Sequence, residues 1–145
     1  MDLSITLAAD VDADRSRVFE VLSTTQGQRG FWTADCDIAD GRARFGFPEA
    51  PVDLIADVST EPATLVRMRV TSGFPFWTGS TWEWQLSDAA RAAAGTGVLF
   101  RHYGFAGGYA EIDLAHTAQT WAMILDRLSR YLSTGRAQPF FPAAT

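Results

Sequence analysis

The 145-residue sequence contains no lysine, and its twelve basic residues are all arginine. It has a single cysteine, Cys36, and two histidines, His102 and His116. The absence of lysine excludes Schiff-base enzymes and phosphate-loop NTPases, because both depend on a lysine amine. One cysteine excludes an internal disulfide and multi-cysteine zinc sites, and two histidines exclude a three-histidine metal centre.

Several other signatures are absent. The sequence has no Gly-x-Ser-x-Gly, His-Glu-x-x-His or Gly-x-Gly-x-x-Gly motif, so serine-nucleophile, metalloprotease and dinucleotide chemistry are unsupported. Cys36 and the two histidines lack the short spacing of zinc ligands. Asp35, Asp37 and Asp40 lack the spacing and glycine of a calcium loop. We therefore expect neither a metal nor a cofactor.

The charge pattern bears on partners and location. The net charge is −5, with −7 on residues 1–65 and +2 on residues 66–145. An acidic chain is a poor binder of nucleic acid, which needs positive charge to neutralise phosphates. No apolar run approaches the ~20 residues of a membrane span, and the first residues do not resemble a signal peptide. The expected protein is cytoplasmic, with no nucleic-acid partner and no membrane span.

Hydrophobic periodicity predicts an α+β fold. Ile5, Leu7 and Ala9 alternate with more polar neighbours as in a strand. Asp12 is the predicted N-cap of a helix over 13–23, followed by a short helix over 26–32 that breaks near Gly27 and Gly30. Strands are predicted over 35–40, 42–47, 52–59, 64–72, 80–87 and 97–104, and a long helix over 114–134 ends at Gly135.

Alternation along these strands predicts one apolar and one charged face of the sheet. Asp40-Gly41 is a strong hairpin signal, and the short connections that follow indicate an antiparallel meander. Charges on the outer face alternate in sign from strand to strand, with Asp53 and Asp57, then Arg67 and Arg69, then Glu83, then Arg101. Opposite charges on neighbouring strands are mildly favourable, which supports this strand order.

The order strand, two helices, six strands, long helix resembles the START-like helix-grip superfamily, also called SRPBCC. Within it the chain is most similar to the polyketide-cyclase and heat-shock-protein ATPase activator-homologue branch. The matching segments are ADVDADRSRVFEVLST at 9–24, GFW at 30–32, GTGVLFRHYGF at 95–105 and WAMILDRLSRYLSTGRAQPFF at 121–141. The resemblance implies a curved antiparallel sheet of about seven strands wrapped around the long helix, with a cavity between them. Residues 1–136 would form one ligand-binding domain, followed by a tail over 137–145.

Eighteen aromatic residues in a chain of this length fit such a cavity. The predicted inner faces of the sheet and helix hold the candidate ligand-binding residues. These are Trp32, Phe45, Met68, Trp77, Trp82, Trp84, Phe100, His102, Trp121 and Leu125. An ordinary hydrophobic core is the competing interpretation of the same set.

His102 is the candidate catalytic residue, because it is the one titratable side chain that alternation places on the inner face of the last four strands. Its imidazole could orient a ligand carbonyl or transfer a proton. The alternative is a core histidine bonded to a backbone carbonyl or to the long helix. Glu83 and Tyr103 are predicted to face outward, so any second polar group would be a hydroxyl of Thr33, Thr64 or Thr71.

Three functions remain open at this stage. The first is binding of a small hydrophobic or aromatic molecule, and the second is a cyclase, aromatase or dehydratase reaction in the same cavity. The third, implied by the resemblance alone, is docking on a chaperone. The loop 72–79 is either a movable gate over the pocket mouth or a segment held against the domain by its aromatic residues. Phe140 and Phe141 in the tail pack either on their own domain or on a second subunit of a homodimer.

Overall fold

Seven strands and three helices make up the computed structural model, which describes residues 3–89 and 95–143 of the chain. Their order confirms the predicted α+β arrangement. They are β1 (Ser4–Val11), α1 (Arg15–Ser23), α2 (Thr25–Phe31), β2 (Asp35–Ala39), β3 (Arg42–Gly46), β4 (Leu54–Glu61), β5 (Leu65–Ser72), β6 (Thr81–Asp88), β7 (Thr96–Tyr103) and α3 (Glu111–Thr134).

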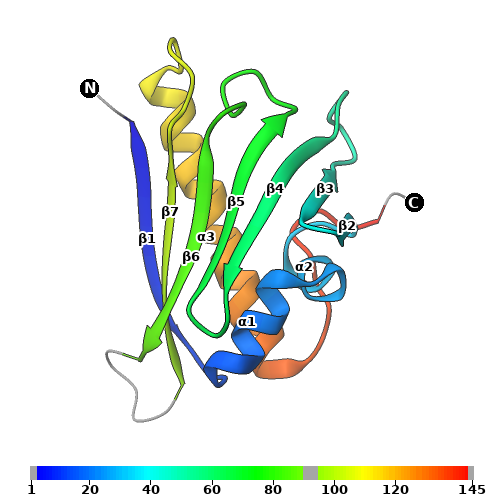
Figure 1. Ribbon diagram of the computed structural model, residues 1–145, viewed down its shortest axis with the longest axis vertical. Helices are drawn as coiled ribbons and strands as arrows, with labels where there is room; N and C mark the ends of the chain where they lie inside the picture. Colours follow the sequence, from blue (N-terminus) through cyan, green and yellow to red (C-terminus); the bar gives the residue numbers. More distant parts are fainter. Residues whose placement is uncertain (1–2, 90–94, 144–145) are drawn as a thin grey trace.

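The strands form one antiparallel sheet in the order β1-β7-β6-β5-β4-β3-β2. The six later strands follow the chain as a meander, and β1 pairs with the last of them, β7. The chain must therefore pass from one edge of the sheet to the other after β1. It does so through α1 and α2, which lie together at one end of the sheet (Figure 1).

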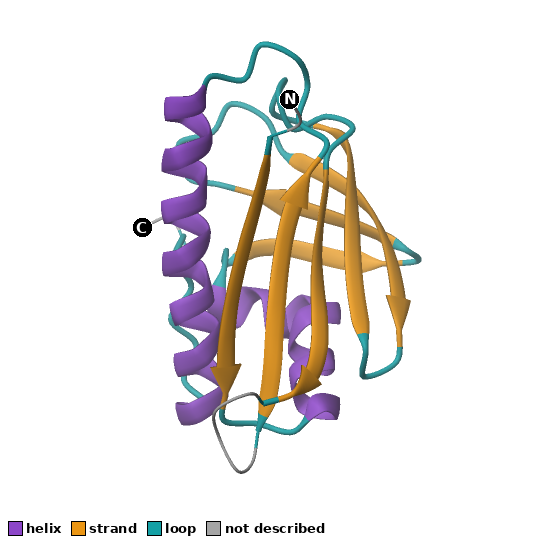
Figure 2. Ribbon diagram, turned by 90° about the vertical axis from the view of Figure 1, so that its left-hand side faces the viewer, coloured by secondary structure: helices purple, strands orange, loops and turns teal. Residues whose placement is uncertain are grey.

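The sheet curves around α3, which lies along its inner face as a second layer (Figure 2). Trp82, Trp84 and Phe100 of the sheet and Trp121 and Leu128 of the helix are all at most 2% exposed. The spacing of the buried residues on α3 confirms the amphipathic pattern in the sequence. The core therefore lies between the sheet and the long helix.

Helix boundaries differ from the predictions by a few residues. Asp14, not Asp12, caps α1, and its carboxylate accepts a 2.8 Å hydrogen bond from the Arg17 amide. The helix begins at Arg15 because capping needs a side chain two or three residues before a free amide, which Asp14 provides. The long helix begins at Glu111 rather than at 114, and its end at Gly135, in the left-handed conformation with φ of 72°, is as predicted.

The short helix α2 is not broken at its glycines, contrary to the prediction. A side-chain carbon on Gly27 would lie 2.0 Å from the carbonyl oxygen of Val21. One on Gly30 would lie 2.5 Å from the ring of Tyr131. Both glycines are therefore explained by close packing against α1 and α3, and helix propensity alone could not show this.

The hairpin at Asp40-Gly41 is confirmed. Both residues have positive φ, 54° and 75°, as a two-residue type I′ turn requires. The next strand, β4, begins at Leu54 rather than at 52, and Val52 is 45% exposed. The segment between β3 and β4 is consequently longer than predicted, and it matters for the pocket described below.

The outer face of the sheet carries the predicted charge alternation. The register places Asp57 opposite Arg69, Arg67 opposite Glu83, and Glu83 opposite Arg101. Arg67 and Glu83 form an ion pair of 3.0 Å. Glu83 is on the outer face as predicted but is only 4% exposed, since its neighbours cover it. Pairing with Arg67 keeps its carboxylate from being buried without a partner.

The C-terminal tail docks on its own chain. The Phe140 amide donates to the carbonyl of Phe31 at 3.0 Å, and the Phe141 amide donates to that of Trp32 at 2.8 Å. The Phe141 ring packs on Phe47 with a centroid distance of 5.0 Å. Of the two alternatives for Phe140 and Phe141, contact with their own domain is the one found among the described residues.

Gly27 provides a test of the junction between the two short helices. Helix propensity alone predicts that Gly27→Ala stabilises the protein by about 1 kcal/mol. Because the new methyl group would meet the Val21 backbone, we expect instead a loss of about 3 kcal/mol in the free energy of unfolding, measured by urea denaturation.

Gly107→Ala is the matched control, since nothing lies within 4 Å of the methyl group it would add. We expect it to change stability by less than about 0.5 kcal/mol. A Gly27→Ala variant as stable as the control would contradict the close approach of α1 and α2.

Candidate functional site

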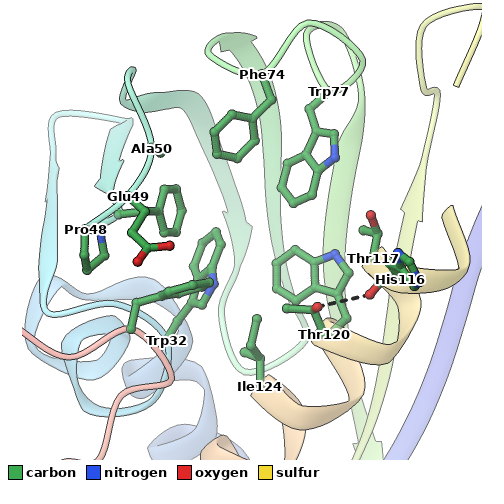
Figure 3. Close-up of a pocket in the computed structure, with 13 residues that line it drawn as sticks. Trp32, Pro48, Glu49, Ala50, Phe74, Trp77, His116, Thr117, Thr120 and Ile124 are labelled. Carbon is green, nitrogen blue, oxygen red and sulfur yellow. Dashed lines mark hydrogen bonds between the residues drawn. The ribbon is translucent and has the colours of Figure 1, made fainter. Parts of the chain in front are cut away.

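A pocket of about 600 Å³ opens beside the first half of α3. Its other walls are the segment between β3 and β4 and the segment between β5 and β6 (Figure 3). The described residues that line it are Trp32, Phe47, Pro48, Glu49, Ala50, Phe74, Trp77, His116, Thr117, Thr120, Trp121, Ile124 and Phe141. The lining is mostly aromatic and aliphatic, as in sites for small organic molecules.

The indole rings of Trp32 and Trp77 both pack against the indole ring of Trp121. The rings of Trp77 and Trp121 are nearly parallel, with an interplanar angle of 17° and centroids 6.0 Å apart. Trp32 is tilted against Trp121, with centroids 5.1 Å apart. Phe47 extends this wall, since its ring lies 5.6 Å from that of Trp32 and 5.7 Å from that of Phe74. The result is a nearly continuous aromatic surface.

The polar side chains of the pocket lie at its rim. Thr117 and Thr120 donate their hydroxyl hydrogens to helix carbonyls of Asp113 and His116, at 2.9 and 3.0 Å. The Thr120 oxygen can still accept a hydrogen bond, whereas that of Thr117 already accepts one from the Tyr109 hydroxyl. Glu49 and His116 are exposed, and Figure 3 shows them on opposite sides of the opening.

The loop 72–79 is pinned on one side of this pocket. Phe74 and Trp77 are partly buried against the core. The Trp77 indole nitrogen donates to the Tyr109 hydroxyl at 3.4 Å, and that hydroxyl is hydrogen-bonded to Thr117 on α3. These contacts tie the loop to the start of the long helix, which is the pinned alternative rather than the gate.

His102 is fully buried next to the pocket but does not line it. The indole nitrogen of Trp121 donates to Nδ1 of His102 at 3.2 Å. Because an indole nitrogen can only donate, Nδ1 must be unprotonated and Nε2 carries the hydrogen. Nε2 lies 2.9 Å from the Ser80 hydroxyl oxygen, to which it donates.

Burial lowers the pKa of the His102 imidazole to about 3. The charged form is disfavoured because the ring lies among aromatic side chains, and a proton on Nδ1 would face the Trp121 N–H. His102 is thus bonded to the long helix, as one of the sequence alternatives held, and both of its nitrogens are engaged. Its catalytic role stays an untested prediction that this geometry disfavours.

The predicted ligand-binding residues divide into two groups. Trp32, Trp77 and Trp121 line the pocket. Of these three only Trp77 is partly exposed, since Trp32 and Trp121 are each 2% exposed. The others do not line the pocket and lie in the core: Phe45, Met68, Trp82, Trp84, Phe100, His102 and Leu125. Thr33, Thr64 and Thr71, the hydroxyls considered as partners of His102, are instead bonded to the carbonyls of Gly46, Pro62 and Ile55.

Several lining residues were not predicted. Glu49 and Phe74 lie in connecting segments, where alternation along a strand gives no information. Phe47 was predicted as the last residue of a strand over 42–47, but β3 ends at Gly46 and Phe47 belongs to the segment that follows. Phe141 reaches the pocket because the tail pairs with the residues after α2. Aromatic residues beside Pro48 and Pro75 were the available signal, since exposed loops seldom place large apolar rings without a packing partner.

No cluster of potential metal ligands occurs among the described residues. Cys36 is buried in β2, and burial raises the pKa of its thiol to about 12. It therefore stays protonated and is a poor ligand or nucleophile. Arg44 bridges Asp35 and Asp37 at 2.7 and 2.6 Å, which explains this pair of acids as an ion-pair cluster at the sheet edge.

Comparison with solved structures gives matches over nearly the whole chain. The Aha1 dimer from Colwellia psychrerythraea matches with a TM-score of 0.76 and 22% identity, over 92% of this chain and 98% of that one. CalU16 from Micromonospora echinospora matches with a TM-score of 0.65 and 20% identity, over 92% and 78%. This chain has the helix-grip fold.

A third match is DynU16, described as a putative protein in the dynemicin biosynthetic locus. It has a TM-score of 0.73 and 18% identity, over 97% of this chain and 51% of that one. Neither the scan against protein-family models nor the search of curated proteins finds a match. At these identities the helix-grip likeness establishes the fold alone, and the function has to be argued from the site.

None of the helices in the described part of the chain has the length and apolar character needed to cross a membrane.

Burial of neutral His102 makes the folded protein less stable at acidic pH than at neutral pH. The folded protein keeps His102 neutral down to about pH 3, whereas the unfolded chain takes up this proton near its ordinary pKa of 6.5. The free energy of unfolding should therefore fall as the pH decreases below 6.5. We expect the His102 contribution to be about 2 kcal/mol smaller at pH 5 than at pH 7.

Urea denaturation of the wild type and His102→Gln at both pH values measures this contribution. His116→Gln, at an exposed position, should keep the wild-type pH dependence. Titration of the His102 ring by NMR tests the same point without a substitution. A ring that protonates near pH 6.5 in the folded protein would contradict the proposed hydrogen-bond arrangement.

Proposed function

We propose that this protein binds a small, largely apolar ligand with an aromatic or planar body in the pocket beside α3. The observation that carries the proposal is the pocket itself, about 600 Å³ in volume and walled by Trp32, Trp77 and Trp121. A volume of this order suits a molecule of several rings. The phenyl rings of Phe47, Phe74 and Phe141 complete the apolar lining.

The energetics favour ligands that cover these rings. Burial of apolar surface contributes about 25 cal/mol per Å², and ring-on-ring contacts add about 0.5–1.5 kcal/mol beyond the buried area. The oxygen of Thr120 can accept a hydrogen bond from a polar edge of the ligand. The indoles are held in place before a ligand arrives, because Trp77 is bonded to Tyr109 and Trp121 to His102. This rigidity lowers the entropic cost of binding.

A cyclase-type reaction needs an acid or base that reaches the ligand. His102 lies behind Trp77 and Trp121 with both nitrogens engaged, and it does not line the pocket. For this reason we place binding ahead of catalysis. For docking on a chaperone, no observation in the described part of the chain identifies a surface for such a partner, because the outer face of the sheet is mainly charged.

Filling the pocket tests the proposal. Thr120 lines the pocket from α3, and Thr120→Trp would place an indole in the space that a ligand needs. We expect this variant to bind the neutral fluorescent probe N-phenyl-1-naphthylamine at least tenfold more weakly than the wild type, as measured by fluorescence titration. Loss of a stacked aromatic contact and its buried area is sufficient for this factor.

Gln119→Trp is the matched control, because the neighbouring side chain is exposed and does not line the pocket. It should bind the probe like the wild type. Equal binding by Thr120→Trp and the wild type would mean that the pocket is not the binding site. Mass spectrometry of the native purified protein would in addition identify a ligand that copurifies.

A further inference from the structure

Charge is distributed very unequally around the pocket. Among the described residues that line it, Glu49 has the one carboxylate, and neither arginine nor lysine is present. Glu49 makes no hydrogen bond or ion pair with any described side chain, although the sheet edge nearby holds an extensive Arg44 ion-pair cluster. The Glu49 carboxylate lies at the opening on the side of Trp32, facing the space between the walls (Figure 3).

The aromatic walls add to this negative potential. The face of an aromatic ring is the negative part of its quadrupole, and indole has the strongest effect. Figure 3 shows the rings of Phe74 and Trp77 on the wall opposite Glu49. A ligand between these walls therefore meets ring faces on one side and a carboxylate on the other. An anionic ligand would find neither arginine nor lysine among the described lining residues to offset the repulsion, and His116 at the rim is the one lining side chain that can become cationic.

We infer that the ligand of this pocket carries a positive charge next to its apolar body, as in a substituted ammonium compound. This inference rests on the proposed binding function and narrows the ligand class. The cation would lie over the partly exposed ring of Trp77, facing Glu49, and the apolar body would cover the partly exposed rings of Phe47, Phe74 and Phe141. The net charge of −5 on the whole chain also favours the approach of cations over anions.

Two ligands of nearly equal shape separate charge from apolar contact. Benzyltrimethylammonium is the cation, and neopentylbenzene has the same shape with a carbon in place of the nitrogen. Each is used to displace N-phenyl-1-naphthylamine at pH 8, above the range in which exposed histidine ordinarily titrates. We expect the wild type to bind the cation about tenfold more tightly than the neutral compound.

Glu49→Gln tests the role of the carboxylate. It should weaken binding of the cation about fivefold and leave binding of neopentylbenzene unchanged. The matched control is Glu61→Gln, which removes the same charge at the opposite end of β4. This control should keep the wild-type preference. High salt should reduce the preference of the wild type and have little effect on Glu49→Gln.

The outcomes separate this inference from the proposed function. If the wild type binds neopentylbenzene as tightly as the cation, the charge preference is wrong while the pocket remains a binding site. The same holds if Glu49→Gln and Glu61→Gln reduce cation binding equally, because the effect is then one of net charge. The proposed function is judged separately, by binding of the neutral probe itself and its loss in Thr120→Trp.

Discussion

The arrangement of this protein depends on the packing of Trp121 between the long helix and the sheet. Its ring contacts Phe100 at a centroid distance of 4.5 Å and Trp82 at 5.7 Å, and both come from the sheet. Its nitrogen donates to His102 on β7. Large aromatic side chains contribute most of the buried area in such contacts, and the hydrogen bond determines how the indole is turned. Helix, sheet and pocket wall are thus joined at one residue.

Filling the helix–sheet layer with aromatic rings also determines where the pocket lies. Trp82, Trp84 and Phe100 occupy the space that a central cavity would need, and protein interiors pack closely. The aromatic-lined pocket lies toward the first half of α3, where loops rather than strands extend the sheet. There Phe47 and Phe74 line the pocket together with Trp121. His102 does not line the pocket, but it accepts the hydrogen bond of the Trp121 indole and so fixes the orientation of this lining residue.

Arginine is used mainly on the outside of the molecule. Arg67 pairs with the nearly buried Glu83, and Arg44 joins the acids of β2. The Arg44 contacts are between partly exposed charges, so each contributes little to stability, whereas Arg67 partners a carboxylate that would otherwise be buried alone. These two arginines form ion pairs on the sheet and do not line the pocket. The pocket lining is left with the carboxylate of Glu49 as its one acidic group among the described residues.

Much of the fold could be predicted from local patterns. Polar and apolar residues alternate along the strands, and apolar residues recur at helical spacing along α3, as at Ala118, Trp121, Leu125 and Leu128. The hairpin at Asp40-Gly41 and the end of α3 at Gly135 follow from backbone conformations that few residues adopt. The site was predicted in part, with Trp32, Trp77 and Trp121 in the lining. The same inner-face pattern does not distinguish a packed side chain such as Trp84 from one that borders open space.

Whether an inner-face side chain is packed or borders the pocket depends on the tertiary structure, because residues far apart in the sequence together fill the layer between sheet and helix. The need for glycine at positions 27 and 30 of α2 comes from the nearby Val21 backbone and Tyr131 ring. Phe141 reaches the pocket through a pairing across more than a hundred residues. The strands, the long helix and their two faces follow from local patterns in the amino-acid sequence. The position of the pocket and the neutral, fully bonded state of His102 were decided only by the contacts that folding brings together.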